Sequence, residues 1–176
     1  LNENGIKSIA CGNFGVSPLE FESYQDFHAV VELSSFQLYY SKNLRCDLGV
    51  FLNFHSDHLD WHKDIEEYKN SKMKLLSFLE SKNNLIVGSN TISSSKLEDI
   101  LGVPSQEIIN RKYTKKFDLQ LSNYPIDTSI AFLKIIDKLN LNLEEAYNFL
   151  KIESNTKHRF ENVEKINGTR FINDSK

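Results

Sequence analysis

Short apolar segments alternate along this chain with stretches of helical periodicity, and this alternation limits the fold more than any other feature. Helical periodicity is clearest over 64–80, about 125–139 and 143–152. Strand-like apolar segments occupy 7–13, 29–34, 47–54 and 83–89, and weaker ones occupy 107–113 and 117–122. Strands separated by helices favour a parallel sheet with helices packed on its faces. We therefore predict an α/β fold with a mostly parallel sheet flanked by helices.

The pattern changes near the C-terminus. The sequence RFENVEKINGTRFIND contains two short strands joined at Asn167-Gly168, the residue pair that a tight type I′ hairpin prefers. We place a linker near 153–157 and predict that 1–154 form one domain and that 155–176 begin a second. Because the sequence lacks an initiator methionine and stops at NDSK, we expect it to be a piece of a longer protein.

Composition excludes several classes of protein. The chain has 176 residues, 40% of them hydrophobic, which is enough to bury a core. Its net charge of −3, with both signs interspersed, indicates no nucleic-acid partner. No segment approaches the roughly 18 apolar residues of a membrane span, and the N-terminus does not resemble a signal peptide. Cys11 and Cys46 are too few for a disulfide framework, so we expect buried thiols and a cytoplasmic protein without a membrane partner.

Polar residues follow three of the predicted strands, at the edge where ligands bind in parallel α/β sheets. The first strand ends in CGNFG, whose glycines let backbone N–H groups approach a phosphate and whose Asn13 can donate from its amide. The second ends at Glu32, which suits a divalent cation, although a capping or hydrogen-bonding role explains it almost as well. The third leads into NFHSDHLDWH, residues 53–62.

The segment NFHSDHLDWH contains His55, His58 and His62. Their spacing differs from that of helical zinc sites, and no cysteine accompanies them, so a closed zinc site is not indicated. Nearby Asp57 and Asp60 make the surroundings rich in oxygen, which suits Mg²⁺ or Mn²⁺ with one imidazole ligand. A polar loop whose aspartates make turn hydrogen bonds explains most of the same residues.

The predicted helix at 64–80 places a lysine where core is expected. Asp64 and Glu67 resemble a capping box at its start. Lys72 falls near the centre of an apolar stripe, whose other members are Ile65, Tyr68, Leu75, Leu76 and Leu79. A snorkelling side chain at the edge of the core is one explanation. The other is that burial favours the neutral amine, which can then do chemistry or be modified.

Six stretches together resemble the Mur ligases of cell-wall synthesis, and most closely the branch that adds D-glutamate. They are GNFG, VVELSSFQL, FLNFHSDHLDWH, EYKNSKMKL, KHRFENV and GTRFINDSK, in the order and approximate spacing that the family shows. The resemblance implies a P-loop NTPase-like central domain followed by the opening hairpin of a C-terminal domain. It also implies a monomeric ATP-dependent ligase of peptidoglycan synthesis, which joins D-glutamate to UDP-N-acetylmuramoyl-L-alanine through an acyl phosphate.

The resemblance further implies two Mg²⁺ ions. By motif, Glu32 would bind one of them and His58 the other. Lys72 matches a carbamylated lysine of the family, whose carbamate supports the second ion. This match agrees with the apolar position of Lys72, because carbamylation requires a neutral amine. Lys72 and His58 are thus predicted to act in both metal binding and catalysis, whereas His55 and His62 are not assigned a role.

The remaining matched positions concern the substrate and the nucleotide. Asn13 and Ser34 would lie near the acyl phosphate. In the C-terminal part, Arg159 and Asp174 match nucleotide contacts, and Lys176 matches a lysine that faces the reacting groups.

Two departures from the family pattern stand beside these matches. The Gly-rich loop ending in Gly-Lys-Ser/Thr does not occur, and we expect it upstream of residue 1, so this chain alone should be inactive. The stretch LSNYPIDTSIAF replaces a motif whose first asparagine lies near the adenine. Pro125 stands close to that position, and Asn123, which is slightly displaced from it, or backbone groups would contact the adenine instead. A non-catalytic, Mur-ligase-like binding module therefore stays open as an alternative, and a metal-dependent hydrolase is a weaker one.

Overall fold

A computed structural model describes residues 1–2, 5–21, 27–88, 112–152 and 161–173. The chain divides into two compact units, Leu1–Asn110 and Arg111–Lys176, which are described separately below. Within the described ranges, no helix has both the length and the apolar character that crossing a membrane requires.

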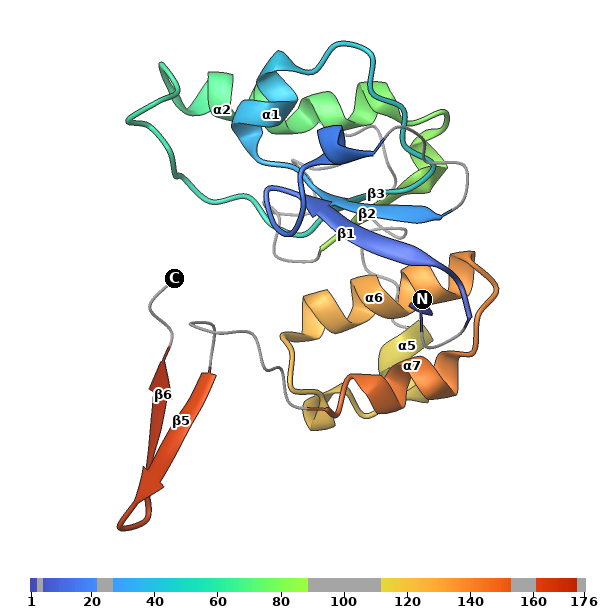
Figure 1. The fold of residues 1–176 in the computed structure, drawn as a ribbon, viewed down its shortest axis with the longest axis vertical. Coiled ribbons are helices and arrows are strands. Elements are labelled where there is room, and N and C mark those ends of the chain that lie inside the picture. Colours follow the sequence, from blue (N-terminus) through green and yellow to red (C-terminus); the bar gives the residue numbers. More distant parts are fainter. Residues whose placement is uncertain (3–4, 22–26, 89–111, 153–160, 174–176) are drawn as a thin grey trace. The chain divides into compact units, whose positions relative to one another are not determined.

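In its described residues, the first unit contains two pairs of parallel strands together with helices (Figure 1). β1 (Ser8–Gly12) pairs with β2 (His28–Glu32), and β3 (Gly49–Phe51) pairs with β4 (Leu85–Val87). A 3-10 helix, η2 (Pro18–Glu20), lies between β1 and β2 in the sequence. The four stronger strand predictions are confirmed, although the strands are shorter than predicted and form two small parallel sheets.

Helices α1 (Ser35–Tyr40) and α2 (Ile65–Met73) lie beside each other in this unit (Figure 1). The predicted helix at 64–80 is confirmed, but after Met73 it tightens into the 3-10 helix η3 (Lys74–Phe78). A further 3-10 turn, η4 (Lys82–Asn84), precedes β4. The sequence analysis did not predict α1, whose six residues are too few for a clear period.

The start of α2 confirms half of the predicted capping box. The Asp64 carboxylate accepts a hydrogen bond from the Glu67 amide at 2.8 Å. The Glu67 carboxylate accepts from the backbone amide of Lys63 at 2.9 Å instead of that of Asp64. The helix is therefore capped as expected, while Glu67 ties down the residue one position earlier.

The apolar stripe of α2 and η3 packs against β3 and β4. Leu85 and Val87 are buried, and they are covered by Phe51, Met73, Leu75, Leu76 and Leu79. Tyr68 is also buried, whereas Ile65 is exposed, so the predicted stripe is wrong at its first residue. Lys72 is half-buried, as expected for a lysine within this stripe.

The second unit contains a helical cluster. Its helices are α5 (Lys112–Lys116), the 3-10 helix η5 (Leu119–Leu121), α6 (Ile126–Lys138) and α7 (Leu143–Phe149). Leu133 on α6 is completely buried in the core of this unit, which also contains Tyr113, Phe117, Leu119, Ile136, Ala146, Tyr147 and Leu150. The predicted helices at 125–139 and 143–152 are confirmed.

Both weaker strand predictions require correction. The strand predicted at 117–122 is wrong, because Asp118 caps η5 by accepting from the Gln120 amide at 3.2 Å, and Phe117 and Leu119 are buried against helices. Of the strand predicted at 107–113, residues 107–111 lie outside the described residues. Lys112 and Tyr113 begin helix α5, so the end of that prediction is also wrong.

A hydrogen-bonded group on α5 and α6 borders this core. The Tyr113 hydroxyl donates to the Asp137 carboxylate at 2.7 Å, and Lys112 donates to the same oxygen at 2.8 Å. These bonds hold the pKa of Asp137 below its usual range. Burial, together with the bond to Asp137, raises the pKa of Tyr113.

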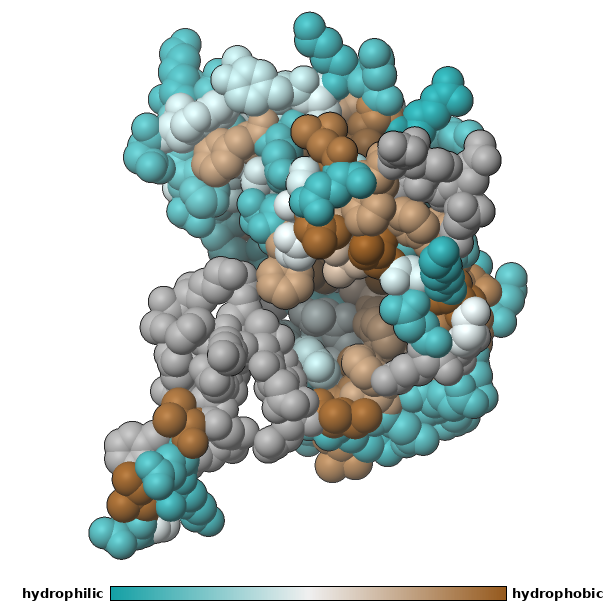
Figure 2. All heavy atoms as spheres, in the orientation of Figure 1, coloured by the Kyte–Doolittle hydropathy of each residue, from teal (hydrophilic) through white to brown (hydrophobic). Residues whose placement is uncertain are grey.

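The last two strands form the predicted hairpin. β5 (Glu161–Ile166) pairs antiparallel with β6 (Thr169–Asn173). Asn167 and Gly168 at the turn both have positive φ, 49° and 83°, as a type I′ turn requires. Val163 and Ile166 on the hairpin are exposed. Figure 2 shows hydrophobic atoms on the surface of the hairpin. The predicted linker at 153–157 lies outside the described residues.

We predict that Leu133→Ala lowers the free energy of unfolding of the second unit by about 3 kcal/mol, because it leaves a cavity in a fully buried position. Leu121→Ala is the matched control, since Leu121 is 59% exposed, and should change it by less than about 0.5 kcal/mol. Urea unfolding followed by circular dichroism measures both. Equal effects of the two substitutions would contradict this description of the core.

Candidate active site

The ends of β1 and β2 bring two predicted site residues into contact. The Asn13 side-chain amide donates to the Glu32 carboxylate at 3.2 Å, and the Asn13 backbone N–H donates to the Glu32 carbonyl at 2.8 Å. Gly12 and Glu32 are partners in the parallel register. The side chains of Glu32 and of Asn13, which follows Gly12, therefore emerge at the carboxyl edge of the strand pair. The expectation that the first two strand ends meet is confirmed.

Gly12 makes this close approach sterically possible. Its φ of +106° is one that side-chain-bearing residues rarely adopt, and a Cβ added there would lie 2.2 Å from the Glu32 carbonyl oxygen. A larger residue would therefore push the end of β1 away from β2. The glycine of the GNFG stretch is required by backbone packing, whatever the strand end binds.

Ser34 is the N-cap of α1 and lies two residues after Glu32. Its hydroxyl accepts from the Gln37 backbone amide at 3.2 Å, and its own backbone N–H donates to the Gln37 side chain at 2.8 Å. This capping box fixes the direction in which the chain leaves β2. Ser34 is thus placed beside the strand end, with its side chain engaged in the cap.

His58 lies in an irregular loop after β3. Its φ is +54°, and its backbone N–H donates to the Asp57 carboxylate at 2.8 Å. The His58 Nε2 lies 3.6 Å from the other Asp57 oxygen, and the side chain is 45% exposed. Asp57 therefore shapes the loop, as predicted, and the His58 imidazole stays accessible to a ligand.

The Lys72 ammonium lies near two aromatic rings. Its Nζ is 5.1 Å from the centre of the Tyr68 ring and 6.0 Å from that of Phe51. The His58 ring meets the same Tyr68 ring edge-on, with their centres 5.9 Å apart. Tyr68 is therefore a common neighbour of His58 and Lys72, and its π-face favours the positive charge of the unmodified lysine.

His62 is the residue whose importance the sequence analysis missed. It is 1% exposed, and its Nε2 lies 2.9 Å from the Ser35 hydroxyl. Its Nδ1 lies 3.7 Å from the Glu67 carboxylate and makes no hydrogen bond within the described part of the chain. Since His62 packs against α1, which was not predicted, no pattern in the sequence distinguished it from the exposed His55.

Cys11 and Cys46 carry no site. Cys11 is buried, which confirms the expectation, and Cys46 is half-buried. Burial and the nearby Asp47 raise the pKa of the Cys46 thiol. Partial burial and the negative charge of Asp47 both favour the unreactive protonated form of the Cys46 thiol.

The donors near the strand ends fit magnesium in chemical type. Among the described residues, no three His, Cys, Asp or Glu side chains form a preassembled metal cluster. Glu32 nevertheless offers carboxylate oxygen and His58 an accessible imidazole, and Mg²⁺ is usually bound by one or two protein ligands together with substrate phosphates and water. A carbamate on Lys72 would add oxygen ligands. This donor set is consistent with Mg²⁺ bound together with a nucleotide.

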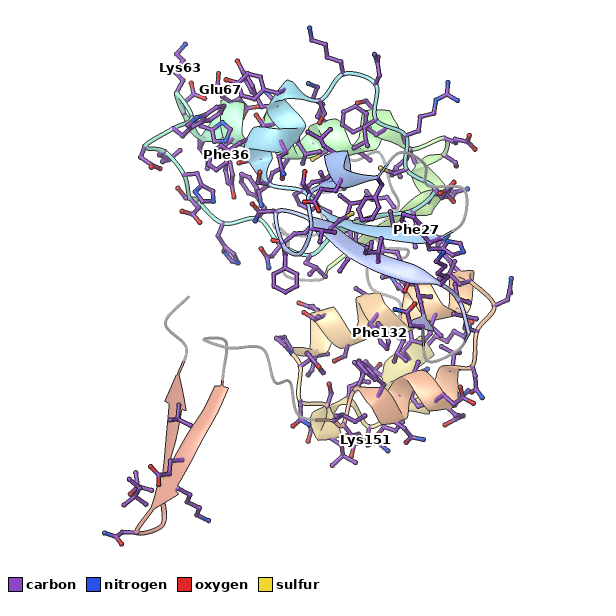
Figure 3. All side chains as sticks on the ribbon, viewed as in Figure 1. Phe27, Phe36, Lys63, Glu67, Phe132 and Lys151 are labelled. Atoms are coloured by element: carbon purple, nitrogen blue, oxygen red, sulfur yellow. The ribbon has the colours of Figure 1, made fainter. Side chains whose placement is uncertain are left out.

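Four other predicted positions belong to the C-terminal part of the chain. Arg159, Asp174 and Lys176 lie outside the described residues. Asn123 donates from its side-chain amide to the Lys151 carbonyl and from its backbone to the Leu150 carbonyl. These bonds hold the start of α6 against the end of α7, close to the labelled Lys151 (Figure 3). Asn123 therefore has a structural role, and its adenine contact stays a prediction.

A comparison with known families decides the classification. Residues 19–159 match the model of the Mur ligase middle domain. The chain belongs to the Mur ligase family. Its α/β fold, with small parallel sheets and helices, is the fold of a Mur ligase middle domain, and the family predicted from the six stretches is confirmed.

Curated relatives of this Mur ligase chain carry more specific names. The UDP-N-acetylmuramoylalanine–D-glutamate ligase of Pseudothermotoga lettingae is 35% identical over 98% of the chain. The ligase of the same name from Francisella tularensis subsp. novicida is 34% identical over 100% of it. The chain spans 42% of the length of each of these relatives.

We predict that Gly12→Ala separates the ends of β1 and β2 and lowers the free energy of unfolding of the first unit by more than about 3 kcal/mol, since it adds a backbone clash to an unfavourable φ. Gly5→Ala is the control, because Gly5 also has a positive φ but has no atom within 4 Å of an added Cβ. Gly5→Ala should lower the free energy of unfolding by about 1 kcal/mol.

Hydrogen exchange at the Asn13 amide, which donates to the Glu32 carbonyl, tests the local effect. Gly12→Ala should accelerate this exchange and Gly5→Ala should not. Unchanged exchange in both variants would show that the strand ends do not depend on Gly12.

Proposed function

We propose that the full-length protein is an ATP-dependent ligase of peptidoglycan synthesis that joins D-glutamate to UDP-N-acetylmuramoyl-L-alanine. The observation that carries this proposal is the contact between Asn13 and Glu32 at the carboxyl ends of β1 and β2. It is supported by relatives that have this name and that align with 98% and 100% of the chain. Such a strand edge is where an α/β domain binds its ligands. We expect the protein to act as a monomer in the cytoplasm.

The proposed reaction has two steps. A carboxylate oxygen of UDP-N-acetylmuramoyl-L-alanine attacks the γ-phosphorus of ATP, so that ADP leaves and an acyl phosphate forms. The neutral amine of D-glutamate then attacks the acyl carbon, gives a tetrahedral intermediate and loses a proton as inorganic phosphate leaves. Both steps depend on holding the reactants in line and on compensating the negative charge of the phosphates.

Within this reaction, the chain's residues would bind and orient. Glu32 would hold one Mg²⁺, and His58 with a carbamate on Lys72 would hold the second. The two ions would neutralise phosphate charge. Asn13, held by Glu32, would present its amide near the acyl phosphate, and Ser34 would fix the backbone beside it. These assignments follow the motif matches and are supported by the accessible positions of Glu32 and His58.

The C-terminal positions complete the proposal. Arg159, Asp174 and Asn123 would bind the nucleotide, and Lys176 would face the reacting groups. The phosphate loop of a P-loop fold, ending in Gly-Lys-Ser/Thr, is not present among the 176 residues. The isolated chain is therefore expected not to catalyse ligation, and the assays below use the full-length protein.

A non-catalytic binding module is the second candidate. It is favoured by one observation, which is that the side chain of Asn123 already bonds to the Lys151 carbonyl. If no other group replaced the Asn123 side chain at the adenine, the nucleotide site would be weakened. A metal-dependent hydrolase is less well supported, because it leaves the ELSSFQL and HRFE stretches unexplained.

We predict that full-length protein releases ADP over repeated turnovers only when ATP, UDP-N-acetylmuramoyl-L-alanine and D-glutamate are all present. Glu32→Gln, His58→Ala and Lys72→Ala should each lower kcat/KM by about 100-fold or more, because each removes a group that would hold a Mg²⁺ ion, and the ions would compensate phosphate charge. His55→Ala is the control for the loop, since His55 is exposed and has no assigned role. Full activity in all three site variants would refute the assignments, and an inactive wild type would favour the binding module.

We predict that Lys72 carries a carbamate in the full-length, Mg²⁺-bound protein. The neutral amine would attack the carbon of CO₂ and lose a proton, which leaves an anion in place of the ammonium. Native mass spectrometry with ¹³C-bicarbonate should show a mass increase of one CO₂ that is absent in Lys72→Ala. Lys74→Ala is the control, because the Lys74 ammonium donates to the Tyr39 carbonyl and has no assigned role. Crystallographic density for a bare ammonium at Lys72 in that state would contradict the prediction.

A further inference from the structure

The buried imidazole of His62 connects three segments that carry proposed site residues. Its Nε2 bonds to Ser35, the first residue of α1, at 2.9 Å. Its backbone N–H donates to the His58 carbonyl at 3.0 Å. Its Nδ1 faces Glu67 on α2 at 3.7 Å, and its ring stacks on Phe36 with the planes 14° apart. Figure 3 shows Phe36 and Glu67 on neighbouring parts of the first unit.

The order Ser35, His62 and Glu67 has the composition of a hydrolytic triad, but burial excludes that role. Ser35 is only 4% exposed, so a substrate carbonyl cannot reach its hydroxyl. The three residues therefore hold structural elements together.

The bond between His62 and Ser35 orients the buried ring. The Glu67 carboxylate accepts from the Lys63 backbone N–H at 2.9 Å, which keeps it near the His62 Nδ1. A distance of 3.7 Å is too long for a hydrogen bond, but a proton on Nδ1 would be attracted by that negative charge. With the proton on Nδ1, Nε2 would accept from the Ser35 hydroxyl, and with the proton on Nε2 it would donate to the same oxygen. Either tautomer keeps the bond to Ser35.

We propose that His62 is a positioning residue for the ligase. It holds the loop that carries His58 against the start of α1, which begins three residues after Glu32, and thereby fixes the two proposed Mg²⁺ ligands relative to each other. The inference rests on the proposed function and adds to it a residue that contacts neither metal nor substrate. Groups behind metal ligands orient them, and their loss typically weakens metal affinity by about 10- to 100-fold.

The first test measures the Mg²⁺ dependence of full-length protein. His62→Phe keeps the aromatic volume but removes the bond to Ser35, and it should raise the Mg²⁺ concentration for half-maximal ADP release by about 10-fold or more. His62→Gln can place its amide where Nε2 bonds to Ser35, and it should restore most of the Mg²⁺ dependence. Ser35→Ala removes the other partner of the bond and should resemble His62→Phe.

A control separates positioning from stability alone. Ser129 is also buried, and its hydroxyl pairs with Ser122 in the second unit at 2.8 Å. Ser129→Ala should lower the melting temperature without changing the Mg²⁺ dependence. If His62→Phe behaves like Ser129→Ala, with a lower melting temperature and an unchanged Mg²⁺ dependence, the inference is overturned.

The second test does not require activity. The Trp61 and His62 backbone amides donate to the His58 carbonyl, so their hydrogen exchange reports whether this turn is intact. His62→Phe should accelerate exchange in the peptide that covers residues 58–62, and His62→Gln should do so less. Should His62→Phe not fold, Ser35→Ala supplies the same two readouts.

The two proposals fail in different ways. If wild type shows no D-glutamate-dependent ADP release, the proposed function is refuted. Hydrogen exchange at residues 58–62 would then be the only test of whether His62 holds the loop. Equal exchange in wild type, His62→Phe and Ser35→Ala would overturn the role of His62 even if the ligase activity were present.

Discussion

The parallel pairing of β1 with β2 is the constraint on which the proposed site depends. It places Asn13 and Glu32 at one edge, and it is possible only because Gly12 has no side chain to meet the Glu32 carbonyl. From that edge the chain passes directly through the Ser34 cap into α1. Helix α1 in turn supplies the hydroxyl that His62 contacts. One steric requirement at a glycine thus determines where the Glu32 carboxylate lies and where α1 begins.

The elements that could be predicted from sequence are those whose pattern is local. β1 to β4 show as apolar segments, α6 shows as a 3.6-residue period, and the hairpin turn follows from the conformational preference of Asn167 and Gly168. The contact between Asn13 and Glu32 was also predictable, because parallel strands end at a common edge. The family could be inferred from motifs, and the match over residues 19–159 agrees with it.

The failures occurred where tertiary packing overrides local preference. Phe117, Leu119 and Leu121 alternate as in a strand. Burial of Phe117 and Leu119 in the helical core makes the 3-10 helix η5 more favourable. Helix α1 is too short to show a period, and without it the burial of His62 could not be foreseen. Ile65 occupies a core position by spacing but faces solvent, because the first turn of α2 extends beyond the core that covers β3 and β4.

The position of the Tyr68 ring has a thermodynamic consequence. An aromatic face attracts the Lys72 ammonium, but it would repel a carbamate anion at the same place. Conversion of Lys72 from cation to anion would therefore weaken this contact and shift the preferred position of the ring, on which the His58 imidazole also packs. The charge on Lys72 and the orientation of His58 would then be energetically coupled. By linkage, a change in the orientation of His58 would in turn change the free energy of modifying the lysine.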